Sequence, residues 1–178
     1  ASLPPMPEPQ RQALRELLPQ HAAAPAWLRD RAERLAWALQ RRVEFVGCDG
    51  LEVDDRMRAV ISFQACLLVA TRDLSLFRPL RSVLVYPGAF VVNETEEDED
   101  GIVTEGEREL SGQSVDDSRV LLSWEDIEDG MRARDGYNVV LHEFAHFLDH
   151  LTDGALSGEG DGELQRQLSE GYRALCDA

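Results

Sequence analysis

The pattern of apolar and polar positions predicts helices in the first part of the chain. From Pro25 to Phe45, apolar residues recur at spacings of three and four, which is the period of an amphipathic helix. Arg58 to Ala70 is apolar on most sides, as expected of a helix at the centre of a core. Asp54 and Asp55 precede it, where a helix cap belongs. A shorter helix is expected from Gln10 to Leu18.

After Pro79 the pattern changes to that of strands. Ser82 to Tyr86 is a run of apolar and β-branched residues, which Phe90 to Val92 continue after a Pro-Gly turn. Arg119 to Trp124 predicts another strand, and Tyr137 to Leu151 predicts a clear helix. Strands that lie close in sequence between two groups of helices indicate an α+β fold with a small mixed sheet.

Several segments carry more local expectations. Residues 1–19 are expected to form an N-terminal arm and a short helix, and residues 20–178 one main domain. The run Glu94 to Asp100 is expected to be a solvated acidic loop. His21 stands among alanines and is expected to be exposed in a loop. A last helix is expected from Glu163 to Leu175.

Composition and charge exclude some classes of partner. The net charge of −16 repels phosphate backbones and acidic membrane surfaces, so we expect neither nucleic acid nor membrane as a partner. The three cysteines (Cys48, Cys66 and Cys176) are far apart and show no metal-binding spacing. Their scarcity favours the reducing cytoplasm.

The segment from Val139 to His150 carries the candidate chemistry. His142 and His146 are four residues apart, so on a helix both imidazoles project from one face and can reach one zinc ion. Glu143 follows the first histidine and is placed to act on a metal-activated water as the general base. The pattern predicts a site for hydrolysis with His142 and His146 as metal ligands.

Other roles around this motif stay open. The alternative for the two histidines is a pair satisfied by carbonyl and carboxylate groups, without metal. Asp149 either orients a ligand histidine or is a plain polar residue near the helix end. His150 is a less favoured third ligand, because three ligands along one straight helix converge poorly on one ion. Tyr137 and Tyr172 are candidate hydrogen-bond donors that nothing singles out.

The strand from Val120 to Ser123 precedes the predicted zinc helix. Two interpretations are open for it. It is either the edge strand along which a peptide substrate lies extended, or an internal strand.

Beyond the zinc motif, blocks along the chain resemble the Mlc titration factor A family of zinc-dependent peptidases. The likeness covers about residues 20 to 155 and is far more specific than the five-residue zinc pattern. The blocks are, in order, Gln64 to Leu68, Arg72 to Leu74, Val83 to Val92, Val120 to Trp124, and Gly136 to His146 with Leu148 and Asp149.

The resemblance implies a fold, an activity and a partner. It implies a bacterial cytoplasmic enzyme with a zincin-like core, similar to the catalytic domain of anthrax lethal factor. It also implies one zinc ion and aminopeptidase-like cleavage of short peptides. Family members in enterobacteria bind the glucose repressor Mlc and relieve repression of sugar-transport genes, so a transcriptional repressor is an implied partner.

The resemblance further implies a third zinc ligand, a glutamate on a helix well downstream of the second histidine. Glu163 and Glu170 lie downstream, but their segment resembles a linker helix of the family, so we assign neither. Two outcomes stay open. Either the C-terminal part of the domain lies outside this sequence, or the site is incomplete and the zinc is absent from this chain.

Three functions are therefore compared. The first is a zinc-dependent metallopeptidase, and the second is a regulatory protein that sequesters a transcriptional repressor and whose zinc site is incomplete or dispensable. The third is a metal-free structural domain. Glu143 favours the first, because a site that only binds metal or a partner needs no base at that position.

Overall fold

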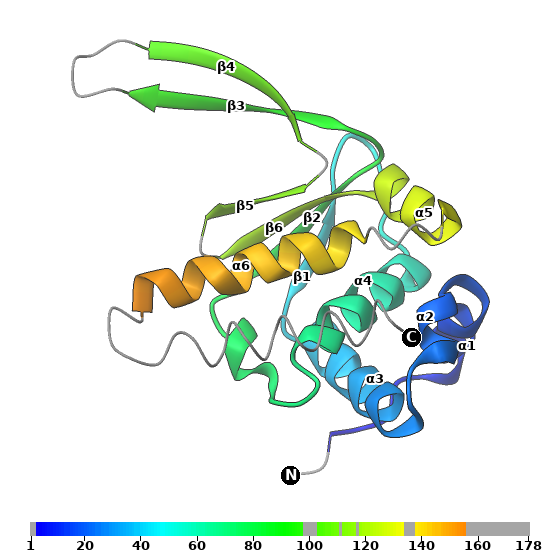
Figure 1. The fold of residues 1–178 in the computed structure, drawn as a ribbon. Coiled ribbons are helices and arrows are strands. Elements are labelled where there is room, and N and C mark those ends of the chain that lie inside the picture. The colour runs from blue at the N-terminus through cyan, green and yellow to red at the C-terminus, as the bar shows by residue number, and fades with distance from the viewer. Residues whose placement is uncertain (1–2, 98–102, 111, 117, 134–137, 156–178) are drawn as a thin grey trace.

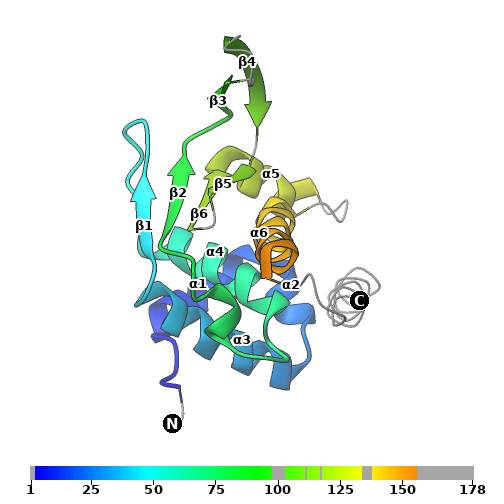
Figure 2. The ribbon, with the colours of Figure 1, turned by 90° about the vertical axis from the view of Figure 1, so that its left-hand side faces the viewer.

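The computed structural model describes residues 3–97, 103–110, 112–116, 118–133 and 138–155. Its helices lie together to one side of a small sheet, and a hairpin projects away from this body (Figures 1 and 2). The helices are α1 (Glu8–Leu17), α2 (Pro19–Ala23), α3 (Ala26–Gln40), α4 (Asp55–Leu68), α5 (Trp124–Ala133) and α6 (Val139–Ala155), with a 3-10 helix η1 (Leu74–Phe77).

The sheet is mixed, which agrees with the predicted α+β class. Its strands run in the order β1 (Glu44–Gly47), β2 (Ser82–Tyr86), β6 (Arg119–Ser123) and β5 (Gly112–Asp116). The first three are parallel, and β5 is antiparallel to β6. Because β1 and β2 are parallel neighbours joined through α4, the fold contains one β–α–β crossover within its α+β arrangement.

Helix α4 lies at the centre of the core, as the sequence predicts. Asp54 caps it, since its Oδ1 accepts a hydrogen bond from the Met57 N–H at 2.8 Å. Side chains around the whole circumference of the helix are buried, and α4 contacts α1, α3 and α6. The core includes Leu14 of α1, so the first helix packs into the same interior as the sheet.

Two strands appear where the sequence predicts something else. The helix expected up to Phe45 ends at Gln40, and β1 follows in parallel register with β2. The acidic loop expected at Glu94 to Asp100 is wrong for residues 94–97, which belong to β3 (Phe90–Glu97) and pair with β4 (Val103–Leu110).

The register of the β3–β4 hairpin explains how acidic residues are accommodated in it. Glu94 is opposite Gly106, and Glu105 is opposite Thr95. Every other glutamate in the paired stretch is also opposite an uncharged residue. Like charges directly opposite one another destabilise a strand pair, and this register avoids them.

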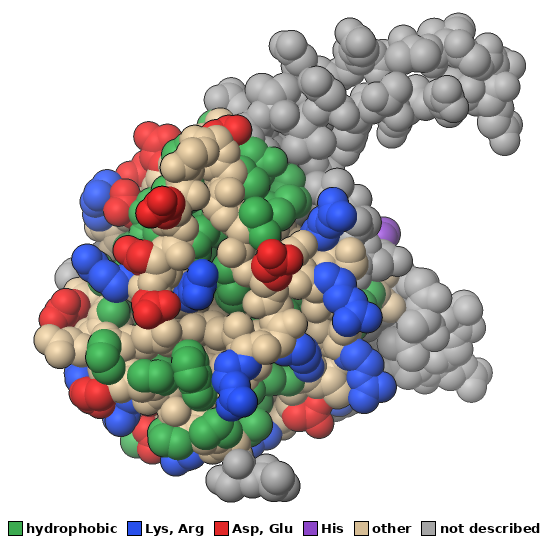
Figure 3. Space-filling view, turned by 180° about the vertical axis from the view of Figure 1, so that it is seen from behind, with side chains coloured by type: hydrophobic (Ala, Val, Ile, Leu, Met, Phe, Trp, Pro, Cys, Tyr) green, Lys and Arg blue, Asp and Glu red, His purple; other side chains and the backbone are tan. Residues whose placement is uncertain are grey.

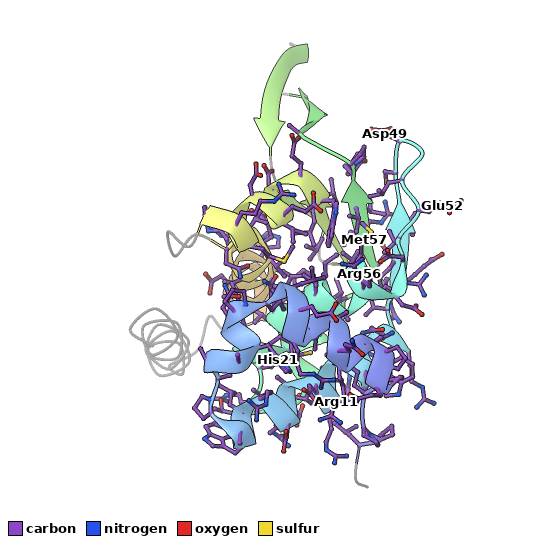
Figure 4. All side chains as sticks on the ribbon, turned by 90° about the vertical axis from the view of Figure 1, so that its right-hand side faces the viewer. Arg11, His21, Asp49, Glu52, Arg56 and Met57 are labelled. Atoms are coloured by element: carbon purple, nitrogen blue, oxygen red, sulfur yellow. The ribbon has the colours of Figure 1, made fainter. Side chains whose placement is uncertain are left out.

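The prediction that His21 is exposed is wrong. Its side chain is buried in α2 beside the ring of Phe63, with the two ring centres 5.2 Å apart. The His21 Nε2 atom lies 2.7 Å from Glu33 Oε1, and the other carboxylate oxygen of Glu33 lies 2.9 Å from Arg11 Nε. Figure 4 shows His21 and Arg11 among the N-terminal helices. A partner on α3 therefore satisfies a histidine whose local sequence suggested solvent.

The two cysteines within the described part, Cys48 and Cys66, are free thiols. Burial raises the pKa of the Cys66 thiol, so this side chain is an uncharged core residue. Over the same part of the chain, none of the helices combines the length and the apolar character that a membrane span requires.

Candidate active site

The first turn of α6 is fixed by a cap immediately before the histidine motif. The Asn138 Oδ1 atom accepts a hydrogen bond from the Leu141 N–H at 3.0 Å, and the Asn138 carbonyl accepts one from the His142 N–H at 3.0 Å. Asparagine is among the residues that satisfy the exposed N–H groups of a helix start best. The helix therefore starts at Val139, two residues later than predicted, and continues to Ala155.

One face of α6 is held firmly in the core. Val140 and Phe144 are fully buried, and Phe147 is nearly so. The ring centres of Phe144 and Phe147 lie 5.5 and 6.4 Å from that of Phe77. The helix also contacts β5 and β6 of the sheet. This packing fixes the rotation of α6 and leaves His142 and His146 exposed on another face.

The two histidines converge, as their spacing predicts. Their Nε2 atoms are 3.0 Å apart, and the ring planes are nearly perpendicular, with centres 4.4 Å apart. Zinc lies about 2.0–2.1 Å from each imidazole ligand, so two nitrogens on one ion must lie within about 4 Å of each other. The observed separation meets that condition. The donor atoms of His142 and His146 therefore fit one zinc ion.

Electrostatics favours the protonation form of His142 that binds metal. Burial, together with the neighbouring charge of His146, lowers the pKa of His142 below its usual value. The neutral imidazole is thereby favoured, and only a neutral imidazole has the lone pair that a metal requires. Without a metal, the 3.0 Å contact is a hydrogen bond in which one ring donates and the other accepts.

Glu143 lies beside this pair and is buried. The residue is 5% exposed, and its Oε1 atom is 3.9 Å from His142 Nε2. Burial raises the pKa of Glu143 to about 7. A carboxylate with this pKa can both accept and release a proton near neutral pH, which is what a general base that later acts as an acid requires.

A third ligand is not located. Within residues 3–97, 103–110, 112–116, 118–133 and 138–155, no three or more His, Cys, Asp or Glu side chains gather as a metal site would require. Asp149 and His150 are exposed further along α6, and their suggested roles stay predictions. The other candidates, namely Glu163, Glu170, Tyr137, Tyr172 and the helix expected from Glu163 to Leu175, lie outside the described residues.

The edge strand beside α6 is not the one suggested by sequence. Strand β6 is internal, because β2 pairs with it on one side and β5 on the other. The interpretation of Val120 to Ser123 as the edge strand is therefore wrong, and the internal interpretation is confirmed. Within the described part of the chain, the two edges of this sheet are β1 and β5, and it is β5 that contacts α6. Its short sequence (Gly112–Asp116) gives no apolar alternation that could have identified it.

Comparison with known proteins adds to this geometry. The family model for glucose-regulated metallo-peptidase M90 matches residues 2–173. An uncharacterized protein of Synechocystis sp. is 33% identical over 156 residues, which cover 86% of this chain and 56% of that protein.

Two further relatives carry the name Mlc titration factor A. The protein of Cronobacter sakazakii is 34% identical over 125 residues, covering 70% of this chain and 47% of its own length. The protein of Enterobacter sp. is 33% identical over 141 residues, covering 79% of this chain and 53% of its own. The chain thus spans about half the length of the curated relatives that it matches.

Proposed function

Because the chain belongs to the glucose-regulated metallo-peptidase M90 family, we propose that it is a zinc-dependent peptidase whose centre is formed by His142, His146 and Glu143. Membership also confirms the resemblance to Mlc titration factor A found in the sequence. The proposal extends to a zincin-like fold, to the cytoplasm as location and to short peptides, cleaved in an aminopeptidase-like way, as substrates.

One observation carries the proposal. Two imidazole nitrogens 3.0 Å apart stand beside a buried carboxylate whose pKa is about 7. A pair of structural histidines explains the first feature but gives no reason for a carboxylate so poorly solvated next to them. Burying Glu143 costs free energy in the charged state, and proteins accept such costs mainly at functional sites.

The roles of the residues follow from their chemistry. His142 and His146 would hold zinc through Nε2, and zinc bound there supplies a Lewis acid that polarises a carbonyl and lowers the pKa of water. Glu143 accepts a proton from the attacking water and afterwards donates it to the leaving amine nitrogen. The apolar packing around Phe144 keeps α6 rigid, so that the three groups stay in position.

Replacing the base tests this mechanism. In Glu143→Gln, we expect kcat for short chromogenic peptides to fall by about 10²–10⁴-fold, because the amide accepts no proton. Zinc content, measured by atomic absorption, is expected to stay at the wild-type level because the ligands are unchanged. The matched control is Glu128→Gln, which removes a carboxylate from α5 and should leave kcat unaltered.

Two results would contradict the mechanism. One is full activity in Glu143→Gln with zinc still bound. The other is the absence of zinc from wild-type protein, because the two imidazoles would then only hydrogen-bond to each other. Replacing His142 by alanine should abolish zinc binding and activity together.

A second function is supported by the names of the relatives. Several are called Mlc titration factor A, so we propose that this chain also binds a transcriptional repressor. The inactive Glu143→Gln variant separates the two activities. If a repressor is the partner, the variant should still capture it in a pull-down while hydrolysing no peptide. Loss of capture in a folded variant would tie binding to the catalytic residue and argue against a separate surface.

A further inference from the structure

Arginines line a groove whose residues are far in sequence from the histidine motif. It lies between the N-terminal arm, α3, the segment that follows α3, and η1, and its volume is about 710 Å³. Its charged lining residues are Arg31, Arg34, Arg42 and Arg78, with Asp30 and Asp73. Arginine thus predominates in the groove, whereas in the whole chain 34 acidic residues outnumber 18 basic ones. Figure 3 shows acidic and basic side chains together on the rear face of the molecule.

Backbone carbonyls, which carry no net charge, position three of these guanidinium groups. Arg31 donates hydrogen bonds to the carbonyl oxygens of Ala70 and Arg72. Arg42 donates to those of Leu74 and Phe77, at 3.1 and 2.9 Å, and Arg34 donates to that of Leu3 at 2.7 Å. Such bonds orient a guanidinium without cancelling its charge, so the cations remain able to attract an anion.

The positive charges are held close enough to repel one another. Burial first, and then the nearby charges of Arg78 and Arg81, lower the pKa of Arg42. Of the two carboxylates in the groove, Asp73 accepts a hydrogen bond from the Ser75 N–H at 2.7 Å and caps η1, and it offsets part of the charge of Arg31 and Arg78. Four guanidinium groups against two carboxylates still leave an excess of positive charge in the groove. An anion in the groove would reduce this repulsion between like charges.

The groove also has an apolar wall. Trp27 is 60% exposed, which makes it the one large hydrophobic side chain classed as exposed within the described residues. Leu3, Leu35 and Leu74 complete this wall. An exposed indole beside guanidinium groups provides a flat surface on which a planar or apolar part of a ligand can lie.

We propose that this groove is a binding site for a small molecule with at least two phosphate or carboxylate groups on a planar or apolar body. The guanidinium groups take the oxyanions, and Trp27 contacts the body. A volume of about 710 Å³ suits one small ligand, since such pockets typically measure about 300–1,000 Å³. This site is independent of the histidine centre and does not require the proposed peptidase activity.

Calorimetric titration with two probes tests the inference. ADP presents phosphates on a planar base, and isophthalate presents carboxylates on a planar ring, so comparing them identifies the preferred oxyanion. We expect at least one to bind wild-type protein at low ionic strength, with affinity that falls as salt is added. Arg78→Gln should weaken this binding by about tenfold or more, because one charge-assisted contact is lost.

Further variants distinguish specific binding in this groove from a general attraction of anions to positive charge. Arg78 is exposed, so its replacement should leave the fold intact, as unfolding curves would verify. The matched control is Arg132→Gln, which removes the same charge from the exposed surface of α5. It should bind like wild type, whereas Trp27→Ala should bind more weakly.

Two outcomes would overturn the inference. Either neither probe binds the wild type, or Arg132→Gln weakens binding as much as Arg78→Gln. In the first case, binding of an oligoglutamate peptide would assign the groove to an acidic protein segment instead. Activity on peptides need not be measured, so failure here leaves the proposed peptidase function untouched.

Discussion

The carboxyl group of Glu143 links the protonation of a single residue to the stability of the whole chain. Burial raises its pKa to about 7 in the folded protein, whereas the pKa of a glutamate in an unfolded chain is about 4.3. Between these two values the folded chain retains a proton that the unfolded chain has released. The free energy of unfolding must therefore decrease as pH rises through this window.

This sign leads to a prediction for the metal-free protein. After chelation of metal, wild type should lose roughly 3 kcal/mol of unfolding free energy between about pH 4.5 and about pH 7.5, relative to Glu143→Gln. The glutamine variant has no group to titrate at this position, so its curve lacks that decline. Urea denaturation at a series of pH values measures both. Parallel curves would show that Glu143 titrates normally.

At the scale of single elements, the helix α6 depends on its first turn. Asn138→Ala removes the oxygen that accepts the Leu141 N–H, and we expect a loss of about 1 kcal/mol in unfolding free energy. Asn138→Asp keeps an acceptor and should preserve most of the stability. Zinc affinity should decline in the alanine variant, because fraying of the first turn of α6 would displace His142, one turn before His146. Equal urea midpoints for both variants would exclude a role for the cap.

Elements with a clear local pattern could be predicted from sequence, including the short strands β2 and β6, whereas elements without one could not. The helices α4 and α6 are specified by their own apolar residues and by the caps Asp54 and Asn138. Strand β1 has four residues and exists because β2 offers a parallel neighbour, which no local pattern reveals. The same holds for residues 94–97 of β3, whose acidic composition suggested a loop and which pair with β4.

The part of the candidate site that lies on the single helix α6 could be predicted from the sequence. The spacing of His142 and His146 fixes their proximity, because it depends only on helix geometry. The burial of Glu143 and the identity of the strand beside α6 depend on packing between distant segments. His21 illustrates the same limit, since its partner Glu33 comes from another helix.

At the scale of the whole molecule, the contacts that Glu33 makes with His21 and Arg11 join α1, α2 and α3. Glu33 is 4% exposed and contacts both His21 and Arg11. Removing one member of a buried ionic group leaves the others unpaired, so Glu33→Ala should cost about 3–5 kcal/mol of unfolding free energy. Guanidinium denaturation would measure this loss.

An exposed ion pair on the same helices provides the control for that experiment. Glu8 bonds to Arg15 and to Arg11 at the surface of α1. Glu8→Gln should change stability far less than Glu33→Ala does, because solvent screens the pair. A loss of similar size in both variants would mean that the Glu33 cluster acts as an ordinary surface pair.

Among the described residues, strand β5 pairs with β6 on one side and has no strand on the other. A substrate that joined this open side would be held by main-chain groups common to all peptides, and its side-chain sequence would matter little. Selection would then depend on conformation. Loose ends and unstructured stretches could straighten and enter, whereas the same residues wound into a helix would resist digestion until they unwound.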